Sequence, residues 1–289
     1  MKPLVIYHGN CADGFAAAWC FHHLRPGVHD FHAGVHGDPP PDVAGRDVFL
    51  VDFSYKREVV ETMLSEALSV TLIDHHISAI RDLEAVRGLT QFTDTERSGA
   101  MLAWDFLNYN FAPAKFGGTR VEPPRLLEHI QDRDLWRFAL PMTREIQSNV
   151  FSLPYTFEVY DRLMRLKGLD LAEFAAAGAA IDRKQAKDLA ELLPQVTRIM
   201  KIGIWLVPVA NLPYMMASEA GNILSRGVER VDPPLFAGTY FDTPTHRKFS
   251  LRSQKGRFDV SLVAASYGGG GHAEAAGFSV LRDHHLARS

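Results

Sequence analysis

The stretch that decides the fold is LVIYHGNCADG at residues 4–14, where a short apolar run leads directly into a polar turn. The run predicts a β-strand over residues 4–7, and Gly14 lets the chain bend into a helix predicted over residues 14–24. His8, Asn10 and Asp13 lie between the two. In a parallel α/β sheet this position is the carboxyl end of a strand, where ligands bind.

The same alternation continues through the first half of the chain. Apolar runs at residues 48–51 and 70–73 predict two more strands, and helical patterns at 56–67 and 98–108 separate and follow them. Strands that alternate with helices in this way form βαβ units with a largely parallel sheet. We therefore predict an α/β fold for this part of the chain.

Two further strand ends carry acidic and imidazole side chains. Asp52 directly follows residues 48–51, and Asp74, His75 and His76 follow residues 70–73. Taken singly, each residue is explained as a helix cap or a surface histidine. Together, three strand ends would bring like-charged carboxylates to one edge, where they repel one another unless a cation neutralises them. The sequence therefore predicts a metal site.

The ligand types indicate which metals this site would hold. Imidazole and carboxylate ligands without a thiolate cluster suit Mn²⁺, Mg²⁺, Fe²⁺ or Zn²⁺ in an open catalytic geometry. The number of candidate ligands suggests two ions, and ions about 3.5–4 Å apart are a recurring solution for phosphate hydrolysis. We expect two divalent ions, Mn²⁺ first and Mg²⁺ as the alternative.

The second half predicts a helical connector and a smaller α/β domain. Residues 156–194 are helical in pattern, and strands at 202–209, 235–240 and 248–251 follow with helices at 217–225 and 259–266. We therefore expect three segments, 1–155, 156–195 and 196–289. The Asp283-His284-His285 string has no preceding strand, so we expect a solvated tail there.

Composition excludes several classes of protein. The chain has 289 residues, 46% of them hydrophobic and 22% charged, as in a globular protein. No apolar run approaches the roughly 20 residues of a membrane helix, and the opening run is too short for a secretory signal. The net charge of −3 argues against a duplex-binding surface, and two cysteines give no disulfide framework. We expect a cytoplasmic protein.

These motifs carry a family resemblance. Residues 7–14 (YHGNCADG), 51–52 (VD) and 74–76 (DHH) resemble the first three motifs of the DHH phosphoesterase superfamily, and HIQDRDLW at 129–136 resembles the fourth. Residues 249–253 (FSLRS), 268–272 (GGGGH) and 275–278 resemble the DHH-associated domain. The resemblance implies an N-terminal parallel-sheet DHH domain, a helical connector and a smaller C-terminal α/β domain. It covers nearly the whole chain.

The resemblance also implies metal ligands. One ion would be held by His8 and Asp52 with help near Asn10, and Asp52 would bridge to a second ion with the remaining ligands, Asp13, His75 and Asp132. Asp132 is preferred to Asp134 because it follows Ile130 by two residues, as in the fourth motif. Asp74 and His76, the expected catalytic residues, would either support the metal ligands or face the substrate.

The chain departs from the family pattern at one turn. Asn10 stands where many relatives carry Asp, and the spacing includes Cys11. An amide oxygen is a weaker ligand than a carboxylate, so the first metal position is the one affected. We expect Cys11 to be a packed turn residue, with a soft metal ligand as the alternative.

In the second domain, we expect a phosphate-binding set. Successive glycines expose backbone N–H groups that can hold an anion, and Arg and His side chains can bind phosphate oxygens. The expected residues are Arg252, Gly269, Gly270, Gly271 and His272.

The function implied by the resemblance is hydrolysis of phosphodiester bonds in short single-stranded oligonucleotides or dinucleotides. Two alternatives remain: a polyphosphate, pyrophosphate or nucleotide phosphohydrolase, and a catalytically weak nucleotide-binding module in which Asn10 disables one metal position. A tryptophan facing the site would favour a nucleotide, because bases stack on aromatic rings. A homodimer is left open.

Overall fold

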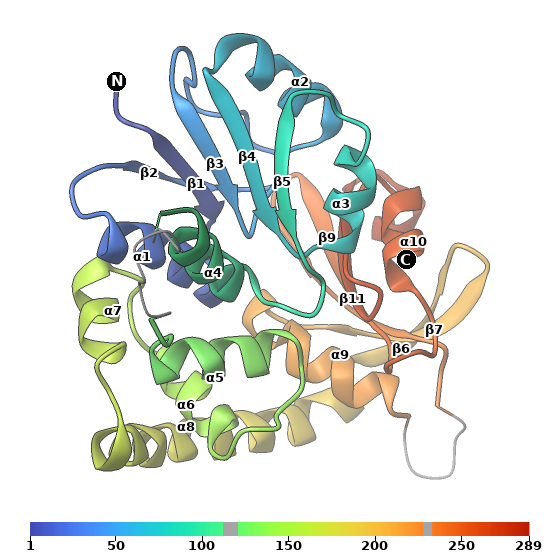
Figure 1. Ribbon diagram of the computed structural model, residues 1–289. Helices are drawn as coiled ribbons and strands as arrows, with labels where there is room; N and C mark the ends of the chain where they lie inside the picture. Colours follow the sequence, from blue (N-terminus) through green and yellow to red (C-terminus); the bar gives the residue numbers. More distant parts are fainter. Residues whose placement is uncertain (112–120, 228–232, 289) are drawn as a thin grey trace. The chain divides into compact units, whose positions relative to one another are not determined.

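Figure 1 shows the computed structural model of the chain, which describes residues 1–111, 121–227 and 233–288. The chain divides into two compact units, Met1–Arg183 (unit 1) and Lys184–Ser289 (unit 2). The division falls inside α8, Gly168–Val196, within the stretch predicted as a helical connector. The functional roles of the predicted segments 1–155, 156–195 and 196–289 remain predictions.

Unit 1 is built on a five-stranded parallel sheet in the order β2-β1-β3-β4-β5. Its strands are β1 Leu4–His8, β2 Asp30–Gly34, β3 Asp47–Val51, β4 Ser69–Asp74 and β5 Leu89–Thr93. The predicted strands at residues 4–7, 48–51 and 70–73 are thus present and adjacent. The sequence did not identify β2 and β5, which bring the sheet to its full width.

Side chains that alternate along these strands form two hydrophobic layers. Val5, Val51 and Ile73 pack in the layer that contains α1 and α4, whereas Ile6 and Leu72 pack in the layer that contains α2. Both faces of a parallel sheet are buried in this way, which explains the continuous apolar runs in the sequence. The helices around the sheet are α1 Ala12–Leu24, α2 Arg57–Glu66, α3 Ile77–Leu83 and α4 Gly99–Phe111.

Along the described part of the chain, four more helices follow α4 before the first strand of unit 2. They are α5 Arg125–Asp134, α6 Thr143–Val150, α7 Phe157–Leu163 and α8. Gly178 of α8 lies against α6 so closely that a β-carbon there would be 1.8 Å from the carbonyl oxygen of Glu145. Among the described residues, no helix combines the length and the apolar character needed to span a bilayer.

Unit 2 contains a six-stranded mixed sheet in the order β10-β11-β9-β8-β7-β6. Its neighbouring strands run antiparallel except β7 and β8, which are parallel. The elements are β6 Thr197–Ile202, β7 Trp205–Asn211, η2 Tyr214–Met216, α9 Ala217–Ser225, β8 Ala237–Asp242, β9 His246–Arg252, α10 Val260–Ser266, β10 Gly270–Gly271, β11 Ala275–Leu281 and α11 His285–Arg288. The α/β class predicted for this half is confirmed.

The structure refines two predictions in unit 2. The strand predicted at residues 202–209 is β7, which begins at Trp205 after the chain reverses at Gly203, whose φ is +62°. Asp283 and His285 are exposed, as predicted for a solvated tail, but His285 also begins α11, whose Leu286 is buried in the core of unit 2.

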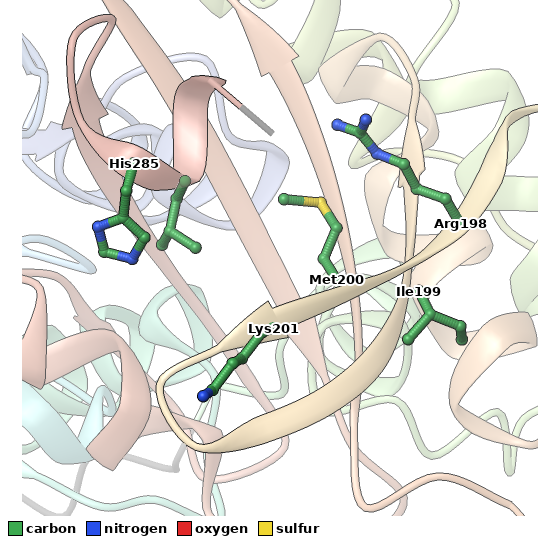
Figure 2. Close-up of a pocket in the computed structure, with 6 residues that line it drawn as sticks. Arg198, Ile199, Met200, Lys201 and His285 are labelled. Atoms are coloured by element: carbon green, nitrogen blue, oxygen red, sulfur yellow. The ribbon is translucent and has the colours of Figure 1, made fainter.

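A pocket lies between β6 and α11 of unit 2. Arg198 and Lys201 extend from β6, and His285 extends from α11 (Figure 2). The guanidinium of Arg198 also donates to the Tyr240 hydroxyl at 2.7 Å. None of the predicted site residues lines this pocket.

An ion pair holds the end of β8 to β9. Asp242 accepts two hydrogen bonds from Arg247, at 2.8 and 3.0 Å, and also pairs with Arg282. Arg247 is buried, and its hydrogen bonds lower the pKa of Asp242 to about 2 against the opposing effect of burial. The ionised pair stabilises the folded state above the ordinary Asp pKa, and this stabilisation is lost as the pH falls through about 2.

We predict that Asp242→Asn destabilises the protein by about 1 kcal/mol at pH 7, a value that allows for partial solvent screening of the pair. Urea unfolding from pH 7 to pH 2.5 measures the difference, which should be constant down to about pH 4 and then shrink. Asp283→Asn, at an exposed position, is the control. A difference that grows toward low pH would contradict this assignment.

Candidate metal centre

The carboxyl ends of β1, β3 and β4 lie side by side in unit 1. Tyr7 pairs with Val51, and Val51 pairs with Ile73, so the residues that follow these three positions share one edge of the sheet. These residues are His8, Asp52 and Asp74. The parallel register thus brings together groups that are more than twenty residues apart in sequence.

Asp52 lies at the centre of this edge. Its side chain is 2% exposed; Oδ1 is 3.1 Å from Nε2 of His75, and Oδ2 is 3.5 Å from Nδ1 of His8. Its φ of +54° is in the left-handed region, which costs energy for a residue other than glycine. The two carboxylate oxygens therefore meet two different histidines, as a bridging ligand would.

Asp13 joins the edge from the first turn of α1. Its Oδ1 accepts a hydrogen bond from the backbone N–H of Ala100 at 3.2 Å. Its buried Oδ2 has no hydrogen-bond partner among the described residues and lies 3.9 Å from Nε2 of His75. A buried oxygen without a donor is expensive unless a cation binds it.

Two glycines allow the helices to approach this closely. A β-carbon on Gly14 would lie 2.5 Å from the carbonyl oxygen of His8, and one on Gly99 would lie 2.4 Å from Cβ of Asp52. Both distances are shorter than real β-carbon contacts allow. The glycines therefore fix where α1 and α4 begin relative to the candidate ligands.

Asp74 orients the two histidines that follow it. Its Oδ1 accepts from the backbone N–H groups of His75 and His76 and lies 2.7 Å from Nδ1 of His76. A hydrogen bond from Nδ1 to the carboxylate places Nε2 on the opposite edge of the His76 ring. Asp74 is thus a positioning residue, while the substrate-facing role of His76 remains a prediction.

The structure separates Asp132 from Asp134. The carboxylate of Asp132 accepts hydrogen bonds from the backbone N–H groups of Ala139 and Leu140 and from the Thr143 hydroxyl, at 2.7–3.0 Å. Asp134 lies at the end of α5, with Oδ2 3.5 Å from Nε2 of His75. We therefore revise the preferred ligand from Asp132 to Asp134, since Asp132 fastens the loop after α5.

Among the possible ligand sets in unit 1, which include Asp52, Asp74, His75 and His76 together, two share no residue. The first group is His8, Cys11 and Asp52, and the second group is Asp13, His75 and Asp134. Within each group, one possible ligand atom from each residue lies within 4.8 Å of the others. Asn10, the predicted helper of the first ion, is exposed.

Burial and neighbouring charges shift the pKa values of the carboxylates in these groups in the way expected at a cation site. Burial raises the pKa of Asp13 well above its usual value, and the charges of Asp52 and Asp134 add to this rise. Burial also raises the pKa of Asp134, although His75 opposes it. Burial alone would raise the pKa of Asp52, but hydrogen bonds with His75 and His8 outweigh this and hold it well below its usual value.

The pKa of His75, which belongs to the second group and also contacts Asp52, is raised by these carboxylates. Burial would lower the pKa of His75, but the hydrogen bond with Asp52 and the charge of Asp134 raise it well above its usual value. Crowded carboxylates thus rely on a positive charge, and a divalent cation would supply it while leaving His75 neutral as a ligand. The donor set fits divalent metal ions.

Sequence reasoning missed one neighbour of the site. His36 follows β2, and its ring centroid is 5.4 Å from that of His8. The sequence did not predict β2, because residues 30–34 (DFHAG) lack an apolar run. Had that strand been predicted, its end would have placed His36 at the same edge.

The predicted phosphate-binding residues lie in unit 2. Arg252 ends β9 opposite Ala275, and its guanidinium donates to the carbonyl of Leu251 and to the Ser218 hydroxyl. The N–H groups of Gly269 and His272 donate to carbonyls of Ala264 and Ala275. The N–H of Gly269 is thus already engaged within unit 2, and the phosphate-binding role of the predicted residues remains a prediction. Gly270 and Gly271 form β10 and pair with β11.

Comparisons with known proteins place this arrangement among solved folds. No protein-family model matches the chain. The chain is 26% identical over 300 residues to the uncharacterized protein R106 of Acanthamoeba polyphaga mimivirus, a match that covers 96% of this chain and 67% of that protein.

The crystal structure of RecJ from Thermus thermophilus, in complex with Mn²⁺, matches with a TM-score of 0.50 and 15% identity. The chain shares the fold of the matched part of RecJ. The match covers 96% of this chain and 49% of RecJ, so the chain spans about half the length of that protein. The pGpG-specific phosphodiesterase PggH of a Vibrio species matches with a TM-score of 0.43 and 14% identity, over 97% of this chain and 94% of that one.

The α/β fold predicted from the sequence is thus confirmed. At this sequence identity the likeness shows the fold, and the activity depends on the side chains at the site.

Asp132 and Asp134 provide a matched pair of variants. We predict that Asp134→Asn weakens Mn²⁺ binding at least about tenfold, because it removes a ligand charge, and leaves the metal-free protein as stable or more stable. Asp132→Asn should instead destabilise the protein by about 2 kcal/mol, because three hydrogen bonds lose their charged acceptor. Calorimetric titration and thermal unfolding measure both effects. The opposite pattern would restore Asp132 as the ligand.

Proposed function

We propose that the chain is a two-metal-dependent phosphoesterase that hydrolyses phosphodiester bonds of short oligonucleotides or dinucleotides. The observation that carries the proposal is the position of Asp52, because one of its oxygens faces His8 of the first group and the other faces His75 of the second. His8 and Asp52 would hold one ion, with Asp13, His75 and Asp134 on the other. The Mn²⁺ in the RecJ crystal structure supports Mn²⁺ as the first ion to test.

In this proposal the bound ions, His76 and the buried carboxylates have different roles in phosphodiester hydrolysis. Divalent ions at such a site would supply Lewis acidity, neutralising phosphate charge and lowering the pKa of water toward about 7. Asp74 holds His76 through Nδ1, so the imidazolium form of His76 can donate from Nε2 to a phosphoryl or leaving oxygen. The buried carboxylates keep this edge selective for cations and for substrates that arrive with them.

One tryptophan supports a substrate with a base. Trp19 and Trp104 are buried, and Trp205 packs on Phe236 in unit 2. Trp136 is partly exposed and follows Asp134 by two residues, with the guanidinium of Arg133 4.2 Å from the ring centroid. An aromatic ring beside a metal ligand is a stacking surface for a base, which polyphosphate lacks.

The first experiment is hydrolysis of fluorescent RNA of about two to ten nucleotides, with and without Mn²⁺. We predict metal-dependent release of mononucleotides, fastest on the shortest substrates, and a loss of at least about 100-fold in Asp52→Ala. Asp283→Asn, which is exposed, controls for handling.

Other outcomes of this experiment separate the alternatives. Hydrolysis of pyrophosphate or polyphosphate in preference to RNA would replace the substrate class while keeping the metal chemistry. Nucleotide binding without turnover, unchanged by metal removal, would identify a binding module and contradict the proposal.

The variant Trp136→Ala tests whether a base of the substrate stacks on this ring. We predict that KM for a dinucleotide rises about tenfold, because stacking contributes about 1–3 kcal/mol per base, with little change in kcat or in pyrophosphate hydrolysis. Phe151→Ala removes an exposed ring that also contacts Arg133 and serves as the matched control. Equal losses on the dinucleotide and on pyrophosphate would show that Trp136 supports Asp134 and does not bind the base.

A further inference from the structure

The turn after β1 presents a thiol to the candidate metal centre. β1 ends at His8, Gly9 bonds back to the sheet through its N–H to Gly34, and Cys11 is the residue that caps the start of α1. Gly14, packed on His8, fixes the distance between strand and helix. The position of Cys11 beside His8 is therefore set by backbone geometry.

The thiol completes a set of three possible ligands. The sulfur of Cys11, a ring nitrogen of His8 and a carboxylate oxygen of Asp52 lie within 4.8 Å of one another. Nδ1 of His8 is buried and lies 3.5 Å from Oδ2 of Asp52. Three potential donors, from the end of β1, the N-cap of α1 and the residue after β3, thus surround one position, and Asp52 links it to the second group.

Asn10 is placed differently. Its φ of +58° turns the backbone between His8 and Cys11, and the residue is exposed. This backbone turn leads the chain to the partly buried Cys11 while Asn10 remains at the surface. The weak amide ligand expected from the sequence is therefore accompanied by a stronger one.

We propose that Cys11 is a thiolate ligand of the first metal position, which gives this position a preference for thiophilic ions such as Zn²⁺, Fe²⁺ or Co²⁺ over Mg²⁺. The second position, with Asp13, His75 and Asp134, keeps only imidazole and carboxylate ligands and suits Mn²⁺ or Mg²⁺. The two positions therefore differ in metal preference. The inference rests on the metal binding in the proposed function and does not depend on the substrate.

The second cysteine provides a matched control. Cys20 lies in the same helix, is fully buried and has its sulfur 3.6 Å from the carbonyl oxygen of Ala100. It belongs to neither group of possible ligands. Cys11→Ser thus removes the thiol at the N-cap of α1, and Cys20→Ser removes the thiol inside the helix.

The test uses the full chain, stripped of metal and titrated with Co²⁺. Wild type and Cys20→Ser should develop the near-ultraviolet charge-transfer absorption of a cobalt–thiolate bond, and Cys11→Ser should lack it. In competition titrations, Cys11→Ser should weaken Zn²⁺ binding at least about tenfold and Mg²⁺ binding much less. Asn10→Ala should keep both the absorption and the Zn²⁺ affinity. Circular dichroism checks that each variant is folded.

Several results would overturn the inference. They are Co²⁺ binding to wild type without thiolate absorption, absorption that persists in Cys11→Ser, and loss of Zn²⁺ affinity in Asn10→Ala but not in Cys11→Ser. The hydrolysis assay is separate. RNA hydrolysis without thiolate absorption would refute the role of Cys11 and keep the proposed function. Thiolate absorption without hydrolysis would support the role of Cys11 and contradict the proposed function.

Discussion

Buried carboxylates at one edge of a parallel sheet are the constraint around which unit 1 is arranged. Asp13, Asp52 and Asp74 are each 2% exposed or less, and Asp134 lies against the same histidine as Asp52. Such groups raise one another's free energy unless positive charge is near. The protein itself contributes His8, His75 and His76, and divalent ions would add the larger charge. The close approach at Gly14 and Gly99 is needed to hold the helices against this edge.

The sheet determines which residues can meet. In a parallel register, the residue after each strand joins the same edge, so His8, Asp52 and Asp74 become neighbours without any contact between their sequence segments. Helix starts then bring further ligands, since Asp13 lies in the first turn of α1. α5 contributes from its other end, with Asp134 as its last residue. Strand ends, helix starts and one helix end thus supply different members of the two groups.

Sequence reasoning predicted the parts that depend on strand ends. The strands at residues 4–7, 48–51 and 70–73 and the helix at 217–225 were identified, because their apolar patterns are regular. Asp132 and Asp134 could not be separated, because both lie in one helical pattern and only the chain reversal after α5 brings Ala139 and Leu140 onto Asp132. β2 was missed because its residues are polar. The partners of the glycines at 269–271 depend on β11, which the sequence did not indicate.

The charge balance at this edge has a consequence for engineering. His75 and His8 stabilise the ionised Asp52 in the metal-free protein, whereas burial and neighbouring carboxylates raise the pKa of Asp13 and Asp134, so these two weaken the fold when no cation is bound. A search for thermostable variants carried out in chelating buffer would therefore favour replacement of Asp13 or Asp134. Stability screens of this protein would reward loss of the site unless the selecting medium contained the metal, so the ion belongs in the library conditions from the first round.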